Sequence, residues 1–235
     1  MKKEGVLFDL DNTLYGYKLP HQKALNVVYS FLKKEIQISK IKFIRLYDLS
    51  KQEIKRELSG TASAHNRILY FQRLIEKTHN TVHPHIILKL YNLYWNTFLK
   101  NMKLDRGVLE TLKRIHKDKI KIAIVSDLTT NIQLKKIKKL GLTRYIDFLV
   151  TSEEAGSEKP HSIMFLLALN KMRLKPEATL FVGDDLSKDI AGSNAVGIES
   201  VLISRKKNKK LSGEDYKKAN HVIKDIKEVL KILNE

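Results

Sequence analysis

Strands and helices alternate along most of this chain, and this alternation limits the possible folds more than any other feature. Short apolar runs of strand type recur between segments of helical periodicity, at residues 6–8, 120–125, 148–150, 179–182 and 200–203. Such alternation is typical of parallel sheets, because each crossover between parallel strands needs room for a helix. The sequence therefore predicts an α/β fold with a doubly wound parallel sheet covered by helices.

One long block interrupts the alternation. Residues 20–100 show helical periodicity and almost no strand signal. We expect four helices in this block. The first spans residues 20–34, the second starts after the N-cap Ser39, the third spans residues 63–77, and the fourth begins at Pro84. The block follows the first strand directly, so it has the position of an insertion. We predict an α/β core domain at residues 1–14 and 106–235, and a helical domain at residues 15–105.

Local signals mark the ends of several predicted elements. Gly141 closes a basic helix at 131–140, Pro160 opens a helix, and Asp225 caps the last helix. The helix behind Ser39 is expected to carry these apolar positions: Ile41, Ile44, Leu46, Leu49 and Ile54.

Size and charge narrow the functional classes. The chain has 235 residues, 43% of them hydrophobic, and no cysteine, which excludes disulfides and thiolate metal sites. We find no signal peptide and no apolar stretch long enough to span a membrane, so we expect a cytoplasmic protein. The net charge is +18. A Lys-rich surface without a specific partner is favoured over nucleic-acid binding, because the densest basic cluster, residues 205–210, holds no aromatic residue on which a base could stack.

Two carboxylates follow the first strand. Asp9 and Asp11 are spaced i, i+2, so both side chains project from one side of the chain at the strand end. Like charges held close together raise each other's pKa unless a cation offsets them, and a divalent metal prefers such hard oxygens. One carboxylate can then act as a nucleophile and the other as a general acid and base. A simple turn is the alternative, because Asp and Asn are common in turns.

Other strands end in residues that suit the same chemistry. Ser126 follows the second strand, Lys159 comes after the third, and Asp184 and Asp185 follow the fourth, with Asp189 one helical turn later. Parallel strand ends can converge on one crevice of a doubly wound sheet. A nucleophile, a metal and fixed donors for phosphate oxygens are what phosphoryl transfer requires.

These motifs resemble those of the haloacid dehalogenase superfamily of phosphohydrolases. The matching segments are residues 8–14, 125–127, 158–161 and 182–190, with linking stretches at 133–141 and 151–159. The resemblance covers the core and identifies the superfamily, but it does not identify the substrate.

The resemblance implies roles for the carboxylates. Asp9 would be the nucleophile and a Mg²⁺ ligand. Asp11 would protonate the leaving group and then activate water, while its backbone carbonyl binds the metal. Asp184 would be a further side-chain ligand. Asp185 and Asp189 would be supporting carboxylates that orient the ligands or their waters.

It also implies a phosphate-binding set. Ser126 and Lys159 would hold the phosphoryl group, and Lys159 would balance the charge on Asp9. Asp127 stands where the family often has Asn, and only its backbone N–H is expected to touch phosphate.

The helical insertion resembles the cap domains of this superfamily, which favour small substrates. Tyr17 lies in the expected hinge, and His65 and Arg67 are candidates for substrate contact, Arg67 with a second anionic group. The alternative is that His65 and Arg67 are merely exposed helix residues.

The sequence as a whole predicts a Mg²⁺-dependent phosphatase of small phosphorylated metabolites, such as nucleotides or sugar and organic-acid phosphates. It would act through an aspartyl-phosphate. A phosphomutase on the same core is one alternative. A non-catalytic nucleic-acid-binding or regulatory protein is another. The sequence leaves open whether the protein is a monomer or a homodimer.

Overall fold

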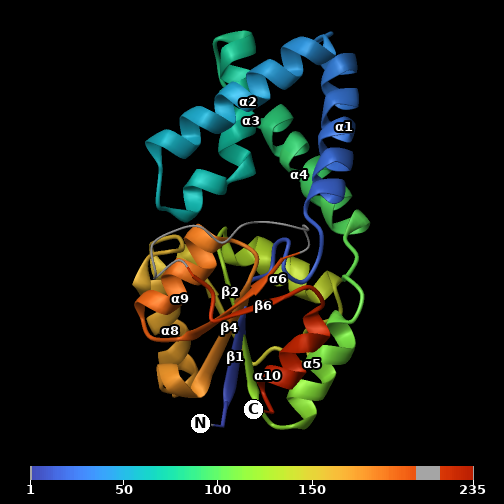
Figure 1. Ribbon diagram of the computed structural model, residues 1–235. Coiled ribbons are helices and arrows are strands. Elements are labelled where there is room, and N and C mark those ends of the chain that lie inside the picture. The colour runs from blue at the N-terminus through green and yellow to red at the C-terminus, as the bar shows by residue number, and fades with distance from the viewer. Residues whose placement is uncertain (1, 205–217, 235) are drawn as a thin grey trace. The chain divides into compact units, whose positions relative to one another are not determined.

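A parallel sheet forms the centre of the computed structural model, which describes residues 2–204 and 218–234 (Figure 1). Within those residues the sheet has six strands in the order β3-β2-β1-β4-β5-β6. The strands are β1 (Gly5–Phe8), β2 (Lys121–Ser126), β3 (Phe148–Thr151), β4 (Thr179–Gly183), β5 (Glu199–Ile203) and β6 (His221–Ile223). The strand order reverses direction at β1, as in doubly wound folds. The predicted fold class is thus confirmed, with β6 as an additional strand that the sequence pattern did not indicate.

The register of β1 sets the positions of the strand ends. Phe8 is paired with Ile124 of β2 and with Val182 of β4. All four residues of β1 are buried, as expected of a strand with neighbours on both sides. The segments that follow Phe8, Ile124 and Val182 therefore emerge side by side at the carboxyl edge of the sheet.

Helices cover both faces of the sheet. They are α5 (Val108–Lys117), α6 (Thr130–Lys139), α7 (Ser152–Ala155), α8 (Ser162–Met172), α9 (Ala191–Ala195) and α10 (Val229–Ile232), with short helical segments at Pro176–Ala178, Leu186–Ile190 and Ile226–Glu228. Figure 1 shows α8 and α9 on one side of the sheet and α5 and α10 on the other. Alternate residues of β1 face opposite layers, and Leu7 packs with Phe165 of α8 and Phe181 of β4.

The chain divides into two compact units. We call residues up to Gly16 and from Lys103 onward the α/β unit, and Tyr17–Met102 the helical unit. The helical unit contains α1 (Lys18–Glu35), α2 (Lys40–Glu57), a 3-10 turn at Ala62–His65, α3 (Arg67–His79) and α4 (Pro84–Asn101). Tyr15 belongs to the α/β unit, because its backbone bridges to Asp11 and Leu104. None of the described helices is long and apolar enough to cross a membrane.

Several predicted element ends are confirmed. The Ser39 hydroxyl caps α2 by accepting from the Lys42 N–H, and Gly141 follows α6 with a φ of 71°. Asp225 caps the short segment Ile226–Glu228, which runs directly into α10, in a reciprocal pair with Glu228. The basic cluster at residues 205–210 lies outside the described residues.

Two local predictions are wrong, and α2 buries a different set of residues from the five apolar positions named for it. Pro160 does not open a helix: α8 begins at Ser162, and the His161 ring caps it by accepting from the Ile163 N–H. The helix expected at 63–77 is broken at Asn66, whose side chain caps a new helix by accepting from the Ile68 N–H. In α2 only Ile54 of the expected apolar positions is buried. The buried stripe of that helix consists of Phe43, Tyr47, Ser50 and Ile54.

Candidate active site

Asp9 and Lys159 form a buried ion pair at the carboxyl edge of the sheet. Asp9 directly follows β1 and is only 5% exposed. The Lys159 ammonium donates to Asp9 Oδ1 at 2.6 Å and to Asp189 Oδ1 at 2.7 Å. The Thr13 hydroxyl donates to the other Asp9 oxygen at 2.9 Å. The structure thus places Lys159 against Asp9 and holds both Asp9 oxygens in fixed directions.

Asp184 completes an acidic cluster beside this pair. One carboxylate oxygen each from Asp9, Asp184 and Asp189 lie within 4.8 Å of one another. Burial raises the pKa of Asp9 well above its ordinary value, and the charges of Asp189 and Asp184 raise it further, against the lowering effect of Lys159. The carboxylate oxygens of this cluster are hard ligands, and their negative charges repel one another. A divalent cation such as Mg²⁺ fits such a site, because it prefers oxygen ligands and offsets the repulsion.

Asp189 and Asp185 have different surroundings. Asp189 Oδ1 accepts from Lys159, and its Oδ2 accepts from the backbone N–H groups of Asp184 and Asp185. Asp189 therefore orients the acidic cluster. The Asp185 carboxylate lies outside the cluster and accepts from the N–H groups of Ser187 and Lys188, which start the next helical turn.

Asp11 is held by two residues that sequence reasoning missed. The Lys136 ammonium donates to both Asp11 oxygens at 2.7 Å, and the Tyr15 hydroxyl donates to Asp11 Oδ1. Lys136 is fully buried, although it comes from a helix rich in surface lysines. The Asp11 side chain is thus held by Lys136 and Tyr15, whereas the Lys159 ammonium lies between Asp9 and Asp189.

Ser126 and Asp127 lie at the end of β2, which is the neighbour of β1. Gln133 of α6 donates from one amide nitrogen to Ser126 Oγ at 2.8 Å and to the Asp127 carbonyl at 2.6 Å. This crosslink fixes the loop that joins β2 to α6. Ser126 is almost fully buried, and its Oγ lies on the same edge of the sheet as Asp9.

The Asp127 side chain supports the loop that carries Lys159. Asp127 Oδ1 accepts from the Lys159 backbone N–H at 3.0 Å, and its Oδ2 accepts from the Lys188 ammonium at 2.9 Å. Burial acts to raise the pKa of Asp127, but the two lysine charges outweigh it and the pKa lies below its usual range. The carboxylate is therefore ionised and ties three loops together.

The three residues predicted to select the substrate lie together in the helical unit. The Arg67 guanidinium donates to the Tyr17 hydroxyl and to the His65 carbonyl. Arg67 is 9% exposed, so the interpretation of this residue as an exposed helix side chain is wrong.

Weak signals in the sequence could have identified two of the missed residues. Lys136 and Gln133 fall on the same helical face as Ile132 and Ile137, so both are polar residues on an apolar stripe. A buried lysine needs an acidic partner, and this rule points to a carboxylate at the adjacent strand end. Lys188 carries no such signal, because the helical segment Leu186–Ile190 that contains it is too short to show an apolar face.

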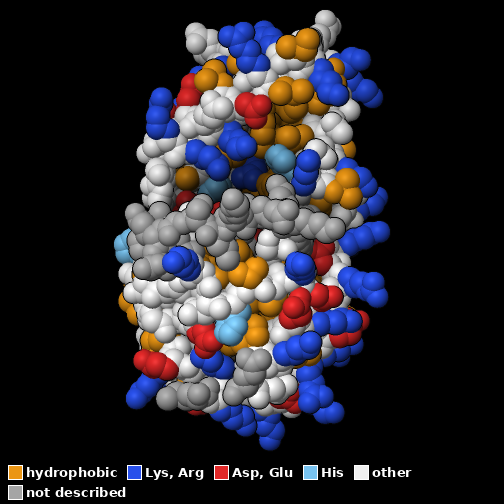
Figure 2. All heavy atoms as spheres, viewed as in Figure 1, with side chains coloured by type: hydrophobic (Ala, Val, Ile, Leu, Met, Phe, Trp, Pro, Cys, Tyr) orange, Lys and Arg blue, Asp and Glu red, His pale blue; other side chains and the backbone are white. Residues whose placement is uncertain are grey.

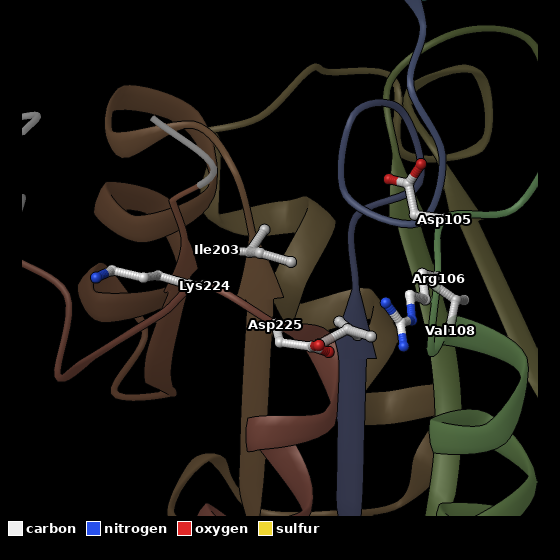
Figure 3. A pocket seen from close by; sticks show the side chains of 7 residues that line it. Asp105, Arg106, Val108, Ile203, Lys224 and Asp225 are labelled. Atoms are coloured by element: carbon white, nitrogen blue, oxygen red, sulfur yellow. The ribbon is translucent and has the colours of Figure 1, made fainter. Parts of the chain in front are cut away.

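A cavity of about 300 Å³ lies near the carboxyl end of β5 (Figure 3). It is lined by the segment before α5 and by the segments around β6, through Asp105, Arg106, Val108, Ile203, Lys224, Asp225 and Ile226. None of the residues in the acidic cluster lines it, so we treat it as separate from the candidate active site.

Comparisons with known proteins agree with this geometry. The sequence pattern of the haloacid dehalogenase-like hydrolases matches residues 6–203. A ribulose-1,5-bisphosphate 5-phosphatase from Halopiger xanaduensis is 42% identical over 206 residues, which make up 84% of this chain and 83% of that protein. A glyceraldehyde 3-phosphate phosphatase from Methanopyrus kandleri is 30% identical over 207 residues, with 87% and 85% covered.

A solved structure shows the same architecture. The crystal structure of a HAD phosphatase from Thermococcus onnurineus is similar over 99% of this chain and 98% of its own, with a TM-score of 0.75 and 25% identity. Family pattern, relatives and fold agree over most of the chain. This chain therefore belongs to the haloacid dehalogenase-like hydrolases and is a phosphoric monoester hydrolase.

Proposed function

We propose that this enzyme is a Mg²⁺-dependent phosphatase in which Asp9 attacks the phosphorus atom of the substrate. The observation that carries the proposal is the buried Asp9 carboxylate, held by Lys159 and Thr13 at the end of the central strand. Asp9, Asp184 and the Asp11 backbone carbonyl would hold the metal, which supplies positive charge to the phosphoryl oxygens when it is bound.

The reaction divides into two displacements. Asp9 forms a bond to phosphorus, the bond to the ester oxygen breaks, and Asp11 gives its proton to the departing alkoxide. A water molecule then loses a proton to Asp11 and attacks the aspartyl-phosphate, which releases inorganic phosphate and restores both carboxyl groups. Lys159, Ser126 and the Asp127 N–H would bind the phosphoryl oxygens during both steps.

The substrate is a small phosphomonoester. Two relatives are named for phosphates of sugars, ribulose 1,5-bisphosphate and glyceraldehyde 3-phosphate, and this supports sugar phosphates within the broader set that includes nucleotides and organic-acid phosphates. We propose that the helical unit, with Tyr17, His65 and Arg67, selects among them.

The decisive experiment replaces the nucleophile. Asp9→Asn keeps the size of the side chain, so it should fold normally but lose about 10³-fold or more in kcat for p-nitrophenyl phosphate. Asp48→Asn makes the same change on an exposed residue of α2 and should keep wild-type activity. EDTA should abolish the wild-type rate, and added Mg²⁺ should restore it.

Two results would overturn this proposal. One is turnover by Asp9→Asn at the wild-type rate, and the other is full activity in EDTA. Released inorganic phosphate is measured directly, because a phosphomutase would use the same Asp9 and Asp11 but return the phosphoryl group to a sugar.

A further inference from the structure

The helical unit buries a positive charge that no carboxylate balances within the described part of the chain. Arg67, the first residue of α3, donates to three neutral oxygen atoms, the hydroxyls of Tyr94 and Tyr17 and the carbonyl of His65. Its guanidinium also lies over aromatic rings, 5.1 Å from the centroid of Tyr70 and 5.6 Å from that of Tyr94. A buried cation normally acquires an anionic partner, because burial without one is costly.

The guanidinium also has unused donors. An arginine carries five N–H groups, and three of them make the hydrogen bonds described above, so two have no partner among the residues that the structure describes. The Tyr47 hydroxyl of the same aromatic cluster is buried and likewise has no partner within the described chain. Buried polar groups without partners are rare, and each calls for a ligand or an ordered water.

The pKa of the nearby His21 reflects both its burial and the positive charge of Arg67. Its Nδ1 lies 2.6 Å from the Tyr94 hydroxyl, and its ring stacks on Tyr17. Burial lowers the pKa of His21 to about 3, and the positive charges of Arg67 and Lys51 add to this effect. The histidine is therefore neutral at physiological pH, and the charge of the cluster comes from Arg67.

We propose that Arg67, with the hydroxyls around it, forms an oxyanion site that takes a phosphate or carboxylate group of a small molecule. A planar guanidinium with two available donors suits two oxygens of one such group. Arg67 is the first residue of α3, which spans Arg67–His79, so the positive end of the helix dipole lies at this residue. Figure 2 shows Lys, Arg and His side chains together on the visible surface of the helical unit, where they attract anions.

Two sources could supply this group. One is a second anionic group on the substrate itself, as in a sugar bisphosphate, and this source rests on the proposed phosphatase function. The other is a separate small anion that binds the helical unit as an effector. The chemistry at Arg67 is the same in both cases, and the experiment distinguishes them.

The kinetic arm compares substrates with one and two phosphates. We expect Arg67→Met to lower the ratio of kcat/KM for ribulose 1,5-bisphosphate to kcat/KM for p-nitrophenyl phosphate by about 100-fold, the loss of one bidentate charge-assisted contact. Arg73→Met is the matched control, because Arg73 lies on the same helix but pairs with Glu53 and Glu57 at the surface. That ratio should stay within about twofold of wild type in the control.

The binding arm uses calorimetry on Asp9→Asn protein, which retains Arg67. If the substrate is the source, the bisphosphate binds one to one, and Arg67→Met weakens it by about 100-fold. If a separate anion is the source, inorganic phosphate shows an additional site that Arg67→Met removes, and the substrate ratio is unchanged. If Arg67→Met changes neither the bisphosphate nor the phosphate isotherm, the proposal is overturned.

A measurement on the wild-type chain covers the case in which Arg67→Met does not fold. Inorganic phosphate should shift the imidazole NMR signals of His21 but not those of His116 in the α/β unit, and unshifted His21 signals would refute the site. Failure of the proposed function looks different. A wild-type enzyme that does not hydrolyse p-nitrophenyl phosphate refutes the phosphatase, while the binding and NMR measurements still test Arg67.

Discussion

At the scale of single residues, two buried cations of this protein, Lys159 and Arg67, differ in their partners. Lys159 lies between two carboxylates, Asp9 and Asp189, and their charges raise its pKa well above its ordinary value although burial opposes this. Among the residues that the structure describes, Arg67 contacts neutral oxygens and rings and no carboxylate. The first arrangement is internally balanced, whereas the second calls for an external anion.

The balance around Lys159 can be broken by one substitution. Lys159→Met leaves Asp9 and Asp189 side by side with no cation, so the free energy of unfolding should fall by about 3 kcal/mol. Mg²⁺ should recover part of this loss by supplying positive charge to the same carboxylates. Denaturant unfolding with and without Mg²⁺ measures both effects. Lys171→Met, which removes a more exposed pair with Glu154, should cost less than 1 kcal/mol. Equal losses in the two variants would contradict this account.

His21 gives the helical unit a defined pH dependence. Its folded pKa of about 3 lies below the unfolded value near 6.5, so the unfolded chain binds more protons between these limits. Stability should therefore fall as pH drops from about 6.5 toward 3, by at most about 1.4 kcal/mol per pH unit. Trp95, the single tryptophan of the chain, lies in the helical unit, and its fluorescence follows unfolding there.

A neutral replacement isolates the contribution of this histidine. The free energy of unfolding of His21→Gln should decline less steeply than that of wild type between pH 6.5 and 4, because carboxylates titrate in both proteins and cancel in the difference. Identical slopes for the two proteins would show that His21 does not stay neutral in the fold.

At the scale of elements, the short helical segment after β4 depends on the absence of a side chain at Gly183. A Cβ built on Gly183 would overlap the Asp189 carboxyl group, which holds Lys159 and two backbone N–H groups. Gly183→Ala should therefore displace Asp189, lower the free energy of unfolding by about 1–3 kcal/mol and reduce kcat at least about tenfold. Gly16→Ala is the steric control for stability, because nothing lies within 4 Å of its added Cβ. Wild-type values for Gly183→Ala would disprove the overlap.

Sequence periodicity predicted the strands and helices of the core. It did not predict the buried face of a helix where two sets of apolar residues both have helical spacing. In α2 the series Ile41 and Ile44 has helical spacing, but so does the series Phe43, Tyr47 and Ile54, and the second is buried. Tyr47 packs against Phe71 of α3, so the neighbouring helix decides which face is covered. The sequence of α2 alone contains no information about that neighbour.

The sequence predicted only some residues of the candidate site, because contacts that depend on neighbouring elements leave no local signal. Asp9 and Asp184 directly follow β1 and β4, and strand ends converge in a parallel sheet whatever the loops do. Lys159 lies in the loop after α7, and its place was predicted from the motif it shares with the family. Lys136 contacts Asp11 across 125 sequence positions, and Lys188 contacts Asp127 from the short helical segment Leu186–Ile190. Such contacts depend on how a helix is rotated and how a turn is shaped, which local patterns do not encode.

At the scale of the whole molecule, the chain carries a net charge of +18. Figure 2 shows Lys and Arg side chains on both units of the visible face, with Asp and Glu among them. Many cations at moderate separation produce a broad positive potential. This distribution suits the attraction of small phosphorylated anions to the protein.

This broad field predicts a dependence on ionic strength. The screening length shrinks from about 30 Å at 0.01 M salt to about 10 Å at 0.1 M, so charges spread over the surface should stop acting together as salt is added. We expect kcat/KM for a phosphomonoester dianion to fall on the order of tenfold between 0.01 and 0.5 M NaCl at constant Mg²⁺. The value of kcat should change much less, because the buried contacts of Asp9 and Lys159 are poorly screened. Initial rates over this range separate the two parameters. A kcat/KM that does not vary with salt would mean that the surface charge plays no part in substrate capture.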